Sequence, residues 1–226
     1  ETTMKDVAQL QWAIGGIALQ IFAKLGGVPW LLKAASPDVH EVVLGLGSAQ
    51  LGTGRFGDRD RTIGLTTAFS GDGAYWLTEA SKAVRFDEHE VAVGTTAVSA
   101  IERVRRQMAW KPGDSVRLVF HSFKDFRGGH VEAIQKALAQ LEQEGLRVQT
   151  AFLHVAENHP ILLLDSVERQ RIPPRGVAFA LNEHEAVVSA LGPDDVRSER
   201  LGFPSPLLIK VHKRSTFTDL DYLPGA

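Results

Sequence analysis

Hydrophobic residues near the start of the chain recur with the period of an α-helix. The apolar positions that share one face are Leu10, Ile14, Ile17 and Ile21. A pair of glycines follows at residues 26–27, where a helix would end. We therefore predict an amphipathic helix over residues 4–25.

Beyond residue 28 the pattern changes to short runs of β-branched, leucine and aromatic residues, separated by clusters of Gly and Asp. Such runs are typical of strands joined by hairpins. Longer segments with helical periodicity then alternate with further strands. The predicted strands are residues 41–47, 62–69, 74–77, 116–123 and 148–155; the predicted helices are residues 89–110 and 130–144; residues 176–181 and 206–211 are candidate edge strands.

The order of these elements predicts the fold class. A meander of three strands followed by alternating helices and strands, βββαβαβ, is the ribonuclease H-like arrangement. We expect an α/β protein with a mixed sheet and helices on both faces.

Composition narrows the classes of function. The chain has 226 residues with 25 Lys+Arg and 27 Asp+Glu, so a site for a polyanion would have to be local. No cysteine is present, which excludes disulfides and thiolate metal sites and is compatible with the cytoplasm. The apolar stretch 14–32 is interrupted by polar residues and glycines, so we expect no membrane span. The first residue is Glu rather than Met, which suggests a piece of a longer protein.

Glycines 45, 47, 52 and 54 follow the first predicted strand. A dinucleotide site would need them to open a helix, but the chain leads into another strand. A glycine-rich hairpin is the favoured interpretation.

Carboxylates are missing where a ribonuclease H-like nuclease would need them. Two-metal hydrolysis requires several acids around metals about 3.5–4 Å apart. Residues 42–51 and 116–124 contain neither Asp nor Glu. Asp125 and Asp165 lie outside these strands, and solvated loop carboxylates are the favoured interpretation of both. We therefore predict neither catalytic residues nor a catalytic metal. A nuclease with relocated acids is the alternative.

Basic residues concentrate in two places. The first group is Arg55, Arg59 and Arg61; the second is Lys210, Lys213 and Arg214, followed by Ser215. Clustered cations and hydroxyl donors suit a phosphate backbone, and a solvated charged loop is the alternative for both groups.

Gln20 and Lys24 lie one turn apart beside the apolar stripe of the first helix. Together they could hold a phosphate, the lysine by its charge and the glutamine by its amide. An ordinary polar flank, with a lysine that complements the helix dipole, explains the same residues equally well.

These segments, taken in order, resemble the PIWI domain of Argonaute proteins. The most specific match is the Lys-Leu-Gly-Gly-Val-Pro-Trp string at residues 24–30. Further matches span nearly the whole chain, at residues 43–48, 63–67, 71–73, 119–124, 152–154, 159–160 and 215–223.

The resemblance implies that Lys24 and Gln20 help bind the 5′-phosphate of a guide strand and that Mg²⁺ can bind at that phosphate. An asparagine common in the family is Gly16 here, which weakens this contact. The catalytic aspartates of active members would fall at Gly47 and near Phe123. The absence of an aspartate at both places implies an inactive domain that resembles the short prokaryotic Argonautes.

The resemblance also implies partners and domains. We expect a guide nucleic acid, with RNA favoured, a complementary target, with DNA favoured, and an associated effector protein in defence against invading DNA. Residues 1–30 would open the PIWI domain at the edge of the middle domain, and residues 31–226 would form a PIWI domain truncated at both ends. A scaffold that only docks an effector is a third possibility.

Overall fold

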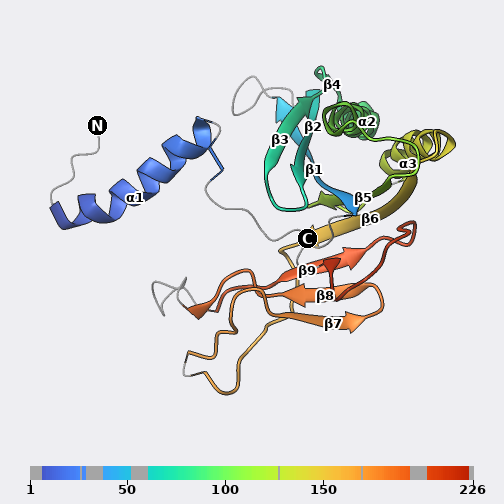
Figure 1. Cartoon of the computed structure of the whole chain (residues 1–226). Coiled ribbons are helices and arrows are strands. Elements are labelled where there is room, and N and C mark those ends of the chain that lie inside the picture. The colour runs from blue at the N-terminus through green and yellow to red at the C-terminus, as the bar shows by residue number, and fades with distance from the viewer. Residues whose placement is uncertain are drawn as a thin grey trace.

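The computed structural model describes residues 7–25, 27–28, 38–51, 61–126, 128–168, 170–193 and 203–223. Figure 1 shows one broad sheet with two helices packed against it and a further helix apart from it. The elements in chain order are α1 (Val7–Lys24), β1 (Val39–Leu51), β2 (Arg61–Ser70), β3 (Tyr75–Ala80), β4 (Val84–Arg85), the 3₁₀ turn η1 (Phe86–Glu88), α2 (His89–Met108), β5 (Ser115–Ser122), α3 (Gly128–Gln143), β6 (Arg147–Ala156), β7 (Ala178–Asn182), β8 (Glu185–Val188) and β9 (Leu207–Val211).

The sheet is mixed, with the strand order β3-β2-β1-β5-β6-β9-β8-β7 and β4 paired to β2. The central strands β1, β5 and β6 are parallel to one another, whereas β2 and β3 form an antiparallel meander on one side. On the other side β9, β8 and β7 are antiparallel. The predicted ribonuclease H-like sheet is confirmed, and the parallel centre places the carboxyl ends of β1 and β5 at one edge.

Alternate residues of β1 face the helices. Val42, Leu44 and Leu46 are buried in one core with side chains of α2 and α3. Gly64 of β2 allows α2 to approach closely, because a Cβ there would lie 2.8 Å from the backbone of Val93. The main core therefore lies between the sheet and this pair of helices.

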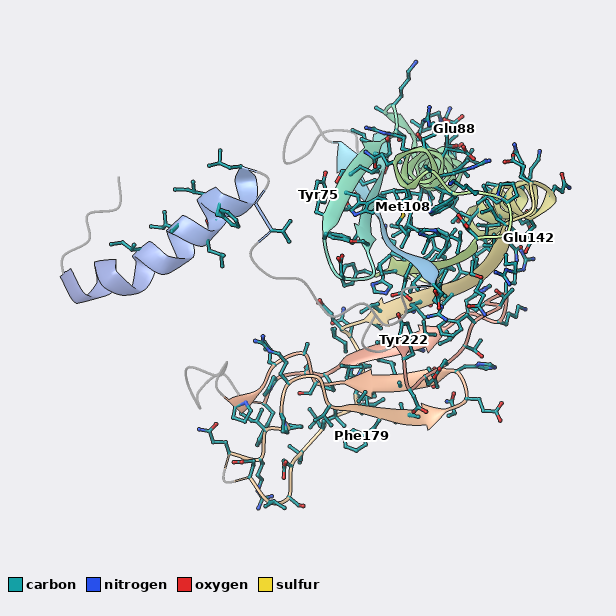
Figure 2. All side chains as sticks on the ribbon, in the orientation of Figure 1. Tyr75, Glu88, Met108, Glu142, Phe179 and Tyr222 are labelled. Carbon is teal, nitrogen blue, oxygen red and sulfur yellow. The ribbon has the colours of Figure 1, made fainter. Side chains whose placement is uncertain are left out.

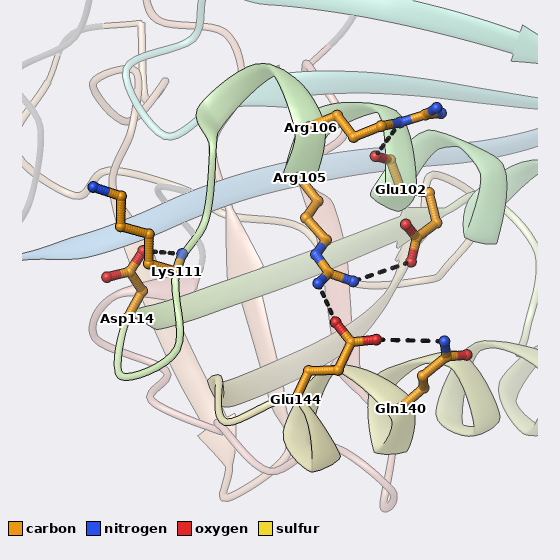
Figure 3. A network of polar contacts seen from close by, with 7 residues as sticks. All are labelled: Glu102, Arg105, Arg106, Lys111, Asp114, Gln140 and Glu144. Atoms are coloured by element: carbon orange, nitrogen blue, oxygen red, sulfur yellow. Dashed lines mark hydrogen bonds and ion pairs between the residues drawn. The ribbon is translucent and has the colours of Figure 1, made fainter.

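A polar network ties α2 to the end of α3 (Figure 3). Arg105 of α2 pairs with Glu144, which follows α3, and lies 3.8 Å from Glu102 one turn earlier on its own helix. The second carboxylate oxygen of Glu144 accepts a hydrogen bond of 3.4 Å from Gln140. These contacts hold the two helices in register over the sheet.

The opposite face of the central strands is covered by the C-terminal segment, residues 212–223. Val119 and Leu153 pack there with Leu223, which is 1% exposed. The guanidinium of Arg117 on β5 lies 4.0 Å from the centre of the Phe217 ring and 5.0 Å from that of Tyr222. Tyr222 lies beside the central strands in Figure 2. The end of the described chain thus closes the second face.

The predicted elements are present, with shifts of a few residues at their ends. The prediction of an edge strand at residues 206–211 is wrong, because that segment is β9, which pairs with β6 on one side and β8 on the other. The structure adds β4 and β8, which are too short to give a pattern of their own, and it extends β1 to thirteen residues. The predicted helix 4–25 is α1, Val7–Lys24, and residues 4–6 of the prediction lie outside the described residues. Ile14, Ile17 and Ile21 on α1 are about half exposed, at 53%, 49% and 54%.

No helix in the described part of the chain is long and apolar enough to cross a membrane.

Candidate nucleic-acid interface

A small cavity lies where the parallel pairing of β1 with β5 ends, and we call it the β1–β5 cavity. Leu46 and Ser122 are partners in the strand register, so the residues that follow them meet at this edge. The cavity holds about 160 Å³. Its lining residues are Leu46, Gly47, Ser48, His89, Val93, Ser122, Phe123, Lys124 and Phe126.

Gly47 and Phe123, the two positions at which the family resemblance would place aspartates, both line this cavity. A Cβ atom at Gly47 would meet no atom within 4 Å, and Phe123 is 72% exposed. The strand register therefore brings the two positions to one site, as the predicted fold requires. Neither Asp nor Glu is among its lining residues.

Lys124 supplies an ammonium group to the β1–β5 cavity. Its Nζ donates a hydrogen bond of 3.3 Å to Ser48 Oγ on β1. Its backbone N–H donates one of 3.1 Å to Ser122 Oγ at the end of β5. The cavity thus presents a cation and two hydroxyl groups.

A second, larger cavity lies beyond β5, and we call it the β6–β9 cavity. It holds about 590 Å³ and is lined by Asp125, Phe126, His154, Asn182, His184, Glu185, Lys210, Val211, His212 and Lys213. His154, Lys210 and Glu185 are neighbours in the register of β6, β9 and β8, so they share one face of the sheet. Phe126 lines both cavities, which are therefore adjacent.

The charges in the β6–β9 cavity are mixed. His154 Nδ1 lies 2.6 Å from Asp125 Oδ1, and Lys210 Nζ lies 3.5 Å from Glu185 Oε1. Burial, followed by the charges of Arg214 and Lys213, lowers the pKa of His212. His212 is therefore less readily protonated than a free imidazole.

The predicted cations near the C-terminus separate into two groups. Lys210 and Lys213 line the β6–β9 cavity. Arg214 instead turns toward α3, where its guanidinium donates to Gln135 Oε1 at 3.2 Å and lies 3.9 Å from Glu132. Of the predicted cations Lys210, Lys213 and Arg214, the two lysines thus line the β6–β9 cavity and the arginine does not.

Ser215 forms a hydrogen bond with strand β6 that its sequence context did not indicate. Its Oγ accepts a hydrogen bond of 3.0 Å from the backbone N–H of Phe152. The next residue, Thr216, accepts one of 2.8 Å from the N–H of Thr150 in the same way. These hydroxyls anchor the C-terminal segment to β6, and contact of Ser215 with a nucleic-acid backbone stays a prediction.

The other predicted binding residues lie at the margins of what the structure describes. Arg55 and Arg59 lie outside the described residues, and of Arg61 only its backbone place at the start of β2 is described. Gln20 is exposed on α1. Lys24 is the last residue of α1, and its side chain also lies outside the described part.

The structure separates the two acids of the alternative nuclease hypothesis. Asp125 lines the β6–β9 cavity beside His154, whereas Asp165 lines neither of the two cavities. Asp165 Oδ1 accepts hydrogen bonds from the backbone of Val167 at 2.7 Å and Glu168 at 3.1 Å, which lower its pKa. Among the described residues, no group of three or more His, Asp or Glu could hold a metal ion.

The histidines of the β6–β9 cavity are the feature that sequence reasoning missed. His154, His184 and His212 come from three different segments, each with an unremarkable neighbourhood in the sequence. Only the register of β6, β9 and β8 brings them together, and no spacing along the chain indicates that register.

Comparison with known proteins agrees with this architecture. The chain is 29% identical over 235 aligned residues to a protein argonaute of Cereibacter sphaeroides, and the match covers 98% of the chain. The chain is homologous to prokaryotic Argonaute. A Piwi protein of Archaeoglobus fulgidus is 20% identical over 191 residues, or 81% of the chain. No protein-family model matches.

Solved Argonaute structures share the fold. An Argonaute of Aquifex aeolicus superposes with a TM-score of 0.62 over 93% of the chain at 18% identity. The Clostridium butyricum Argonaute, bound to a guide DNA and a 19-mer target DNA, superposes with a TM-score of 0.62 over 96% at 17% identity. The resemblance to Argonaute and its PIWI fold is thus confirmed.

The chain spans 30% of the length of the Cereibacter Argonaute and 43% of that of the Archaeoglobus Piwi protein. The solved Argonautes are matched over 27% and 26% of their chains.

Proposed function

We propose that this chain is the PIWI module of an Argonaute that holds a guide nucleic acid and supports recognition of a complementary target without cleaving it. Homology over the full length of the chain supports the nucleic-acid partner. The composition of the β1–β5 cavity supports the absence of cleavage. That cavity is the observation that carries the proposal.

In a ribonuclease H-like nuclease the carboxyl ends of the central parallel strands present acids to two metal ions. In this chain the same edge presents Gly47, Phe123 and the ammonium of Lys124. A cation repels Mg²⁺ and attracts phosphate. The site is therefore suited to binding a strand rather than to hydrolysing it.

The guide 5′-phosphate is assigned in this proposal to Gln20 and Lys24, with Mg²⁺ as an additional ligand of that phosphate. Phosphate oxygens and water would have to supply much of the coordination, because Gln20 offers only an amide and Lys24 no acceptor.

Lys24→Ala should weaken binding of a 5′-phosphorylated guide by about 1.5–3 kcal/mol, the usual loss for a hydrogen bond to a charged group. It should change binding of a 5′-hydroxyl guide far less, since that guide has no terminal phosphate to contact. Titration of both guides into the intact protein measures the contrast. Equal losses for the two guides would leave Lys24 as a helix-terminal cation without a ligand.

The proposal includes an RNA guide, a DNA target and a role in the cytoplasm in defence against invading DNA, with an associated effector protein to act on the recognised target. Sequencing the nucleic acid that co-purifies with the intact protein tests these assignments together. We expect short RNA with uniform 5′ ends. Co-purification of random cellular nucleic acid would contradict guide binding.

Two rival functions predict different outcomes. A nuclease with relocated acids would cleave a guide-paired target with Mg²⁺ or Mn²⁺, and Asp125→Ala would abolish that cleavage. A scaffold that only docks an effector would show no binding that depends on a guide.

A further inference from the structure

The β1–β5 cavity carries an inference about the strand that it binds. Apart from Lys124, its only ionisable lining residue is His89, at the N-terminus of α2. The backbone dipole of the twenty-residue helix α2 places partial positive charge at this N-terminus. The electrostatic contributions of the lysine and the helix have the same sign, and the lining contains no acid to cancel them.

The two serine hydroxyl groups of the cavity can each donate a hydrogen bond to a ligand. Ser48 Oγ accepts from Lys124 Nζ at 3.3 Å, and Ser122 Oγ accepts from the Lys124 backbone N–H at 3.1 Å. Each serine keeps its own hydroxyl hydrogen to donate to another acceptor. One ammonium and two hydroxyl donors match the oxygens of a phosphodiester, which accepts but does not donate.

The walls of the cavity strengthen this match. Leu46, Val93, Phe123 and Phe126 contribute mainly apolar surface around Lys124. A lower local dielectric increases the attraction between the ammonium and an anion. The volume of about 160 Å³ leaves room for a single phosphate group.

We propose that the β1–β5 cavity is a phosphate-binding site, in which Lys124, Ser48 and Ser122 hold one backbone phosphodiester of the bound target strand. Lys124 supplies the positive charge that metal ions would supply at an acidic site. The site rests on the proposed function, because it requires that a strand be held over this edge of the sheet.

The contact across the sheet gives the site its geometry. Ser48 and Lys124 are 76 positions apart in the chain, and the pairing of β1 with β5 brings them together. Lys124 directly follows Phe123, which is exposed, and both residues line the cavity. An exposed aromatic ring next to a cation is typical of surfaces that bind single strands.

The experiment compares Lys124→Gln with wild type in the intact, guide-loaded protein. A series of complementary DNA targets carries one uncharged methylphosphonate linkage, moved one position at a time along the paired region. Lys136→Gln, on the exposed surface of α3, is the matched control for loss of a lysine. Target dissociation constants are measured at several salt concentrations.

We expect one linkage, or two adjacent ones, at which methylphosphonate weakens wild-type binding about three- to tenfold but has no effect on Lys124→Gln. Lys124→Gln should also reduce the slope of log affinity against log salt by roughly 0.7–0.9, the value for one lost phosphate contact. Ser48→Ala should weaken target binding through the same linkage only, so that methylphosphonate there no longer has its full effect. Lys136→Gln should behave as wild type.

Two outcomes would overturn the site while leaving nucleic-acid binding intact. In the first, Lys124→Gln weakens every target equally, including those that carry methylphosphonate at any linkage. In the second, the variant binds every target as wild type does. If the wild-type protein bound no target in the presence of guide, both the phosphate-binding site and the proposed function would be wrong.

Discussion

His121 is a partly exposed histidine whose ring nitrogen Nε2 is buried, and the fold disfavours its protonation. It precedes Ser122 on β5, and its Nε2 has no hydrogen-bond partner. Burial lowers the pKa of His121 from 6.5 to about 4. The folded protein therefore holds this ring neutral over a range in which the unfolded chain would bind a proton.

This difference predicts a dependence of stability on pH. Because the unfolded state binds the extra proton, the contribution is fully present above pH 6.5 and is lost as the pH falls toward about 4. The free energy of unfolding should decrease by roughly 2–3 kcal/mol over that interval through His121. Urea denaturation at a series of pH values measures it.

His121→Leu should flatten this part of the pH profile, whereas His184→Gln, at an exposed position, should leave it unchanged. The readout is the slope with pH, so a constant offset in stability caused by repacking does not affect it. A profile equally steep with and without His121 would contradict the assignment.

Some features of the site at the level of single residues could be predicted from the sequence, and others could not. The absence of Asp and Glu from residues 42–51 and 116–124 is visible in the sequence, and the β1–β5 cavity, which these segments border, is lined by neither residue type. The contact between Lys124 and Ser48 was not visible, because it depends on the register of two distant strands. The ion pair of Arg214 with α3 was missed for the same reason.

At the scale of elements, polar and apolar side-chain contacts anchor the C-terminal segment to the central strands. Tyr222 donates a hydrogen bond to Glu41, and Glu41 also pairs with Arg117 at 3.2 Å. Burial and the Glu41 carboxylate raise the pKa of Tyr222 to about 12, so the phenol stays protonated and keeps donating. Leu223 completes the anchor inside the second core.

Leu223→Ala should lower the free energy of unfolding by about 2–5 kcal/mol, because the removed methyl groups leave a cavity in the core that covers the central strands. Leu162→Ala makes the same chemical change at a side chain that is 60% exposed, and should cost no more than about 0.5 kcal/mol. Urea unfolding of both variants measures the difference. Equal losses would mean that the segment does not stabilise the sheet.

The helices and long strands were predictable because their hydrophobic periodicity extends over many residues. The apolar face of α3 is one case, with Val131, Ile134, Leu138 and Leu141 all buried. The strands β4 and β8 have two and four residues, so neither provides a period to detect. The coverage of the second face by the C-terminal segment depends on tertiary contacts alone.

At the scale of the whole molecule, the two cavities lie next to each other. The loop after β5 separates them and contributes Lys124 to one cavity and Asp125 to the other, with Phe126 lining both. The cations Lys124, Lys210 and Lys213 therefore lie along one side of the sheet, although the net charge of the chain is −2. Because Asp125 and Glu185 lie among these lysines, the surface is mixed in charge, which favours a specific strand path over general attraction to polyanions.

The most direct test of the account follows one labelled target in the presence of guide and metal. The intact protein is loaded with guide, mixed with a complementary target labelled at its 5′ end, and incubated with Mg²⁺ or Mn²⁺; retention and strand length are then measured on the same sample. We expect retention that requires both the guide and complementarity, with the target at full length throughout. A shortened product cut opposite the guide, or equal retention of a non-complementary strand, would contradict the central claim that this chain recognises a target without cleaving it.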